Sequence, residues 1–124
     1  MAMKKTKIKW LKAPQPHDYP AAEAYLRLIL LPQAARLAAV ELTSAAMTTL
    51  AAKDIFRASG VSLLGVSNSH VEKDRARITR GKKLSPLLLF RNPDQGRLVI
   101  ADGYHRLCAV YMFDEDAMIP CKIV

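Results

Sequence analysis

The sequence has little cysteine, little negative charge and no long apolar run, and each shortage narrows the class of protein. Its 124 residues include two cysteines, Cys108 and Cys121, too few for a disulfide framework, so we expect two reduced thiols in a cytoplasmic protein. No apolar run approaches the roughly 20 residues that cross a bilayer. No apolar segment of the secretory type follows the lysine-rich N-terminus. We therefore expect no membrane partner.

Positive charge is abundant instead. Lysine and arginine number 19 against 11 acidic residues, which gives a net charge of +8. Five of the basic residues fall in the first twelve positions, and a second cluster runs through positions 73–83. Such a balance attracts polyanions such as nucleic acid or nucleotides. The sequence is equally consistent with a solubilising tail and a solvated helix face.

Prolines divide the N-terminal third of the chain. Residues 1–16 are basic, contain two prolines and show no period, so we expect a flexible arm. Residues 17–45 predict a helical hairpin, with Asp18 as the cap of the first helix and Pro32 at the start of the second, over 32–42. The residues at helical spacing that should form the buried face of the first helix are Ala22, Tyr25, Leu26, Ile29 and Leu30.

The remaining residues, 46–124, alternate between strand and helix patterns. Ser69 and Glu72 have the spacing of a capping box, and residues 92–96 read as a hairpin turn. We expect one compact domain over 17–124, of mixed α+β class, with a small mixed sheet flanked by helices. The strands are expected over 47–51, 87–91, 97–101 and 119–124, and the helices over 53–59, 69–80 and 103–113.

The strongest functional pattern is the turn from Asp102 to Arg106, where a strand runs directly into a helix. A helix start offers free backbone N–H groups and the positive end of the helix dipole, and Gly103 lets a ligand approach them. Arg106 can bind a phosphate with two donors, and His105 adds another donor. Asp102 is either a helix cap or a ligand of a divalent metal beside the phosphate. These residues predict an anion-binding site.

A plain Asp-Gly turn accounts for the same residues. Asp102 would then only cap the helix, and Arg106 would pair with an acid such as Asp114 or Glu115. Short glycine motifs match by chance often enough that spacing does not decide between the two.

The stretch VIADGYHRLCAVYMFDEDAMIPCKIV, residues 99–124, resembles the ParB/sulfiredoxin superfamily. It is similar to the end of ParB N-terminal domains, where a Gly-Glu-Arg-Arg turn precedes a helix and a final strand, and to the sulfiredoxin Gly-Cys-His-Arg turn. The similarity covers about residues 46–124. It implies a ParB/sulfiredoxin-like fold with the helical hairpin as an addition.

In that superfamily the turn binds nucleotide phosphates, CTP in ParB and ATP in sulfiredoxin and free-serine kinases. The resemblance therefore implies a nucleoside triphosphate with Mg²⁺, and a homodimer as an expected partner state. A second ParB motif would fall near Asn68, with His70 and Lys73 as candidates by position. The implied phosphate contacts in the turn are Gly103, Tyr104, His105 and Arg106.

Departures from the family limit the chemistry. Tyr104 stands where sulfiredoxin has its cysteine, so sulfiredoxin activity is not expected. A partition protein has further domains after this one, and no metal-binding cluster supports DNA hydrolysis. If the chain is a nucleotide hydrolase or kinase, Asp102 and His105 are the candidate catalytic residues, and Asp102 is the candidate metal ligand.

Two other functions fit the sequence. One is a nucleic-acid-binding accessory protein, in which Trp10 either stacks on a base or, as we expect, pins the arm to the protein. The other is a protein-interaction module without catalysis, in which an apolar stripe on the hairpin binds a partner. The nucleic-acid contacts would be the arm and the second basic cluster, namely Arg75, Arg77, Arg80, Lys82 and Lys83, with Lys73 beside them.

Overall fold

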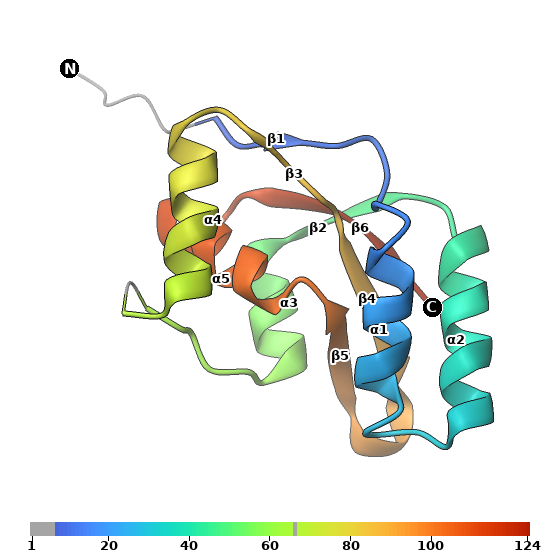
Figure 1. Ribbon diagram of the computed structural model, residues 1–124. Helices are drawn as coiled ribbons and strands as arrows, with labels where there is room; N and C mark the ends of the chain where they lie inside the picture. The colour runs from blue at the N-terminus through green and yellow to red at the C-terminus, as the bar shows by residue number, and fades with distance from the viewer. Residues whose placement is uncertain (1–6, 66) are drawn as a thin grey trace.

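A computed structural model describes residues 7–65 and 67–124 and shows a mixed α+β fold (Figure 1). The elements, in chain order, are β1 (Lys9–Trp10), α1 (Asp18–Leu26), α2 (Pro32–Ser44), β2 (Thr48–Ala51), α3 (Ala52–Ser59), α4 (Ser69–Thr79), β3 (Lys83–Leu84), β4 (Leu87–Asn92), β5 (Arg97–Asp102), α5 (Tyr104–Phe113) and β6 (Met118–Ile123). The α+β class expected from the alternating patterns is confirmed.

The main sheet has the strand order β2-β6-β4-β5. β6 lies parallel to β4, while the β2–β6 and β4–β5 pairs are antiparallel. β4 and β5 form the expected hairpin through a 3₁₀ turn, Pro93–Gln95, which ends at Gly96 with φ +61°. The sheet is therefore mixed, as the patterns predicted.

Residues of β4 point alternately into two cores, because side chains alternate across a strand. Leu87 and Leu89 pack in a core with buried residues of α3, α4 and α5. Leu88 packs on the other side, in a core with buried residues of α1, α2 and β5. The hairpin α1–α2 thus covers one face of the sheet and the other three helices cover the opposite face (Figure 1).

The expected flexible arm is wrong in part. Lys9–Trp10 forms β1, which pairs in parallel with β3, a strand that the sequence did not predict. Trp10 packs against the core shared by α3, α4 and α5, so it pins the segment to the protein, as expected. Residues 1–6 of the predicted arm lie outside the described residues. The pairing escaped prediction because both strands are two residues long and their hydrogen bonds are non-local.

The hairpin is present, but two details of its first helix differ from expectation. α1 ends at Leu26, before Ile29 and Leu30 of its predicted buried face, because the N–H groups of Leu28 and Ile29 bond three residues back and tighten the chain into turns. Ala22 and Leu26 are buried as predicted, whereas Tyr25 and Ile29 are 46% and 43% exposed.

Large exposed apolar side chains gather on the hairpin. Leu28 is 82% exposed and Leu31 is 78% exposed, and Leu37 and Val40 on α2 are more than half exposed. This is the exposed apolar surface that a protein-interaction module would require.

Asp18 does not cap α1, contrary to expectation. No side chain caps that helix. The Asp18 carboxylate is buried and accepts hydrogen bonds from the Gln15 N–H, at 2.9 Å, and from the Ser85 hydroxyl. These bonds fix the start of α1 to the β3–β4 segment, a tertiary role that a local capping pattern does not reveal.

The capping box predicted at Ser69 and Glu72 is also wrong. Asn68 is the N-cap of α4, and its Oδ1 accepts the N–H groups of His70 and Val71 at 3.0 and 3.2 Å. Glu72 lies beside Arg75 instead, with 3.7 Å between its Oε2 and Arg75 Nη1.

The Asn68 cap gives a direct test by urea unfolding. We expect Asn68→Ala to lower the free energy of unfolding by about 1 kcal/mol, because two N–H groups lose their acceptor. The matched control is Ser69→Ala, which should change it by less than about 0.5 kcal/mol. A larger loss for Ser69→Ala than for Asn68→Ala would restore the capping box.

Both cysteines are free thiols in the core, as expected. Burial raises the pKa of Cys121 to about 11. Among the described residues, no helix combines the length and apolar character that a membrane crossing demands.

Candidate anion-binding site

The site begins where β5 passes into α5 through Gly103. Gly103 has φ +111°, and a Cβ at this position would lie 2.7 Å from Leu87 Cγ. Both the backbone angle and the close approach therefore require glycine. No side chain caps α5, and the Gly103 carbonyl accepts the Leu107 N–H at 2.9 Å. The N–H groups of the first turn are thus left without a side-chain acceptor.

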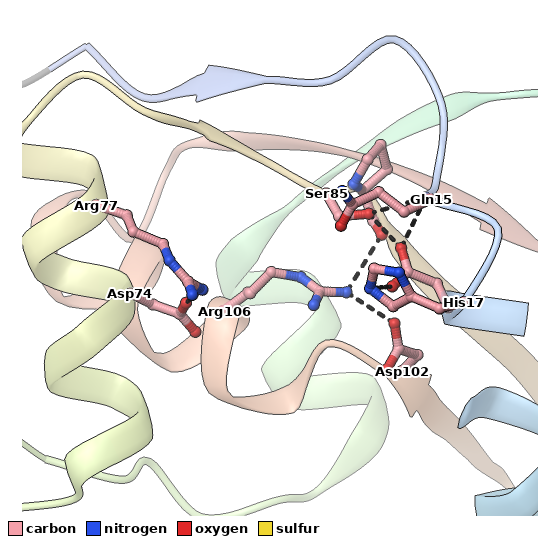
Figure 2. Close-up of polar contacts among 9 residues, drawn as sticks. Gln15, His17, Asp74, Arg77, Ser85, Asp102 and Arg106 are labelled. Carbon is pink, nitrogen blue, oxygen red and sulfur yellow. Dashed lines mark hydrogen bonds and ion pairs between the residues drawn. The ribbon is translucent and has the colours of Figure 1, made fainter. Parts of the chain in front are cut away.

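Asp102 and Arg106 brace this turn. Arg106 Nη2 lies 2.9 Å from Asp102 Oδ2, and each side chain is 18% exposed. Arg106 Nη2 also donates to the Pro86 carbonyl at 3.4 Å. Figure 2 shows the guanidinium pointing toward Asp102 and away from α4. Both earlier roles for Asp102 and Arg106 in a plain turn are wrong: Asp102 does not cap α5, and the acid that pairs with Arg106 is Asp102.

The ion pair does not fully offset the burial of Asp102. Burial raises the pKa of the Asp102 carboxyl, and the charge and hydrogen bond of Arg106 oppose that rise. Arg106 Nε is buried with no hydrogen-bond partner among the described residues, so this donor is unused.

Two histidines meet at the start of α5. His70, at the beginning of α4, and His105 have ring centroids 4.8 Å apart. Burial lowers the pKa of His105, and the neighbouring His70 lowers it further. These influences outweigh the opposing charge of Asp74 and favour the neutral ring, which can accept a proton or donate one hydrogen bond.

A cavity of about 280 Å³ lies between α4 and the start of α5. Residues 102–106 form one wall, and the other is a stripe on α4. Lys73 is exposed and forms no ion pair with another described residue, whereas Arg77 bonds to the buried Asp74 at 2.9 Å. Since Arg77 and Arg106 each have a carboxylate partner, Lys73 supplies the unbalanced positive charge of the cavity. The α4 residues that line it are His70, Lys73, Asp74 and Arg77.

Most of the predicted phosphate contacts line this cavity. The cavity brings together Gly103, Tyr104, His105 and Arg106 with His70 and Lys73. Asn68 is not among the lining residues, since its side chain caps α4.

The predicted nucleic-acid residues are divided. Arg75 lies beside Arg80 in a hollow on α4 outside the cavity, with its guanidinium 5.3 Å from the centre of the Phe113 ring. Arg77 lines the cavity. Arg80, Lys82 and Lys83 are exposed.

Sequence reasoning missed Asp74, and it gave Arg77 only a nucleic-acid role. With His70 and Lys73 these residues have the spacing i, i+3, i+4 and i+7, which places them on one face of a helix. A polar stripe of this kind, read as a unit, would have identified the second wall of the cavity.

The described residues contain no group of three or more His, Cys, Asp or Glu side chains that could hold a metal ion. Asp102 is one carboxylate in the cavity wall, and Arg106 already occupies its Oδ2.

No family model, curated protein or solved structure matches this chain.

Proposed function

We propose that this protein is a ParB-like domain that binds a nucleoside triphosphate, CTP or ATP, through the Gly103–Arg106 turn. The observation that carries the proposal is the start of α5, whose first-turn N–H groups lack a side-chain cap and adjoin a cavity lined by Lys73. Backbone N–H groups, a helix dipole and an unpaired ammonium are the features that bind phosphate.

The cavity suits the phosphates rather than a whole nucleotide. Ligand pockets for larger molecules begin at about 300 Å³, and this cavity measures about 280 Å³. The base and ribose would therefore extend beyond it. The two histidines would add hydrogen bonds, and Mg²⁺ would arrive with the phosphates.

Turnover is a separate part of the proposal. The neutral His105 ring is the group in the cavity best suited to accept a proton near pH 7. Asp102 is the remaining candidate, held in place by Arg106.

Thermal unfolding with CTP, ATP, GTP and UTP, with and without Mg²⁺, tests the binding. A ligand at 100 times its Kd adds about 2.7 kcal/mol, which should raise the unfolding midpoint by roughly 10 °C for a chain of this size. Lys73→Gln should weaken binding by about tenfold or more, because a charge-assisted contact is lost.

The matched control is Arg57→Gln on α3, which removes the same charge from a side chain that is 87% exposed and does not line the cavity. Arg57→Gln should leave the midpoint shift intact. If no nucleotide raises the midpoint, or if the two variants reduce the shift equally, the proposal is wrong.

A further inference from the structure

Two basic segments that are far apart in the sequence lie side by side in the β1–β3 ladder (Figure 1). The ladder places Lys9 opposite Lys83, and Trp10 opposite Leu84. Leu84 is buried in the core and Trp10 packs against it, whereas Lys9 and Lys83 are exposed. Because strand side chains alternate, the two ammonium groups share the outer side of the ladder.

The turn between α4 and β3 adds further basic side chains next to the two lysines. Gly81 has φ +72°, and a Cβ built there would lie 3.6 Å from Lys9 Nζ. Lys9 therefore lies against the turn that carries the neighbouring basic side chains. We name this surface the basic edge: it consists of Lys7, Lys9, Arg80, Lys82 and Lys83, all exposed.

The basic edge is unbalanced. None of its members forms an ion pair with another described residue, and none lines the cavity beside α5. Like charges directly opposite each other in a ladder destabilise it, by up to about 1 kcal/mol. The Lys9–Lys83 pair therefore works against the fold, and a bound polyanion would relieve that repulsion.

We propose that the basic edge binds the phosphate backbone of nucleic acid, without sequence preference. Closely spaced, unpaired lysine and arginine side chains neutralise phosphates and release their counterions. Trp10 is partly buried against the core, on the side of the ladder away from the two lysines, and the basic edge itself contains no aromatic side chain on which bases could stack. The surface therefore favours a duplex over a single strand.

An anionic membrane is the less suitable polyanion. Interfacial binding combines basic residues with apolar side chains that enter the lipid. Among the described residues, the large exposed apolar side chains lie on the hairpin and at Leu63 and Met118, and none belongs to β1 or β3.

Fluorescence anisotropy with a short labelled DNA duplex, without nucleotide, tests the proposal. Five phosphate contacts predict a slope of log K against log salt near −4.5, so affinity should fall roughly 500-fold between about 50 and 200 mM salt. The double variant Lys9→Gln/Lys83→Gln should make the slope shallower by about 1.8. Its unfolding midpoint should equal or exceed that of the parent, because a like-charge pair is removed.

The control variant is Arg36→Gln/Arg91→Gln, which removes the same charge from exposed positions on α2 and β4. It should keep the salt slope of the parent protein. Lys73→Gln should also keep that slope, which separates this surface from the proposed nucleotide site.

Duplex RNA and a single strand of equal length serve as further probes, and we expect the single strand to bind less tightly than either duplex. Absence of duplex binding at about 50 mM salt, equal loss in both double variants, or binding of anionic vesicles in place of the duplex would each overturn the proposal.

Discussion

Gly103→Ala is expected to lower the free energy of unfolding by about 4 kcal/mol. A non-glycine residue held at φ +111° is strained by about 1–3 kcal/mol. The added methyl group would also lie 2.7 Å from Leu87 Cγ, and Leu87 is fully buried. Overpacking of a filled core adds about 1–3 kcal/mol. Urea unfolding followed by circular dichroism measures the loss.

Gly96→Ala is the matched control. Gly96 also has a positive φ, +61°, but no atom lies within 4 Å of the position its Cβ would take. This substitution should therefore cost only the backbone strain, about 1 kcal/mol. Equal losses at Gly96 and Gly103 would show that Leu87 moves aside, and that the close packing under the turn does not restrict this position to glycine.

The same turn shows what the sequence reveals of the fold. The run from β4 through β5 and α5 to β6 was predicted nearly to its boundaries. Its patterns are local: apolar strand residues, a turn rich in Asn, Pro, Asp and Gly, and a glycine before a helix. Where neighbouring residues determine the backbone, the sequence is sufficient.

The sequence-based predictions are wrong where contacts with residues distant in the sequence determine the structure. Asp18 looks like a cap, but Ser85 and the Gln15 N–H bind its carboxylate. Tyr25 has the spacing of a buried residue, yet the hairpin buries its small alanines and Leu26 instead. The β1–β3 ladder depends wholly on a contact between positions more than seventy residues apart. Periodicity contains none of this information.

The residues of the candidate site likewise fall into a group predicted from a local pattern and a group brought together by tertiary packing. Gly103, His105 and Arg106 were identified from the turn, because a helix start after a strand has a recognisable local pattern. The α4 wall was predicted only in part, by analogy at His70 and Lys73, since the packing of α4 against α5 is a tertiary contact. The partner of Arg106 proved to be Asp102, one turn before it, rather than an acid beyond the end of the helix.

The ion pair between Asp102 and Arg106 should also contribute strongly to the free energy of unfolding. We expect Arg106→Met to lower the free energy of unfolding by about 3 kcal/mol at pH 7, because it leaves a mostly buried carboxylate without its partner. Urea unfolding measures this loss as well. Arg27→Met is the control, because Arg27 and Glu23 have the same i, i+4 spacing and the same 2.9 Å separation, with Arg27 49% exposed. An exposed pair contributes less than about 1 kcal/mol, and its loss should be correspondingly small.

The pH dependence of Arg106→Met identifies the cause. Burial already raises the pKa of Asp102 above its ordinary 3.8, and loss of the guanidinium removes the main opposing influence. An acid whose pKa is higher in the folded than in the unfolded chain favours folding at low pH, and that contribution disappears as pH rises through the folded pKa. The loss of stability in Arg106→Met should therefore shrink on acidification toward pH 4.

The control is the double variant Asp102→Asn/Arg106→Met, which lacks the titrating carboxyl at position 102. It should recover part of the stability at pH 7, and its remaining loss should not shrink on acidification. A deficit independent of pH would instead assign the loss to the packing of the Arg106 side chain rather than to its charge.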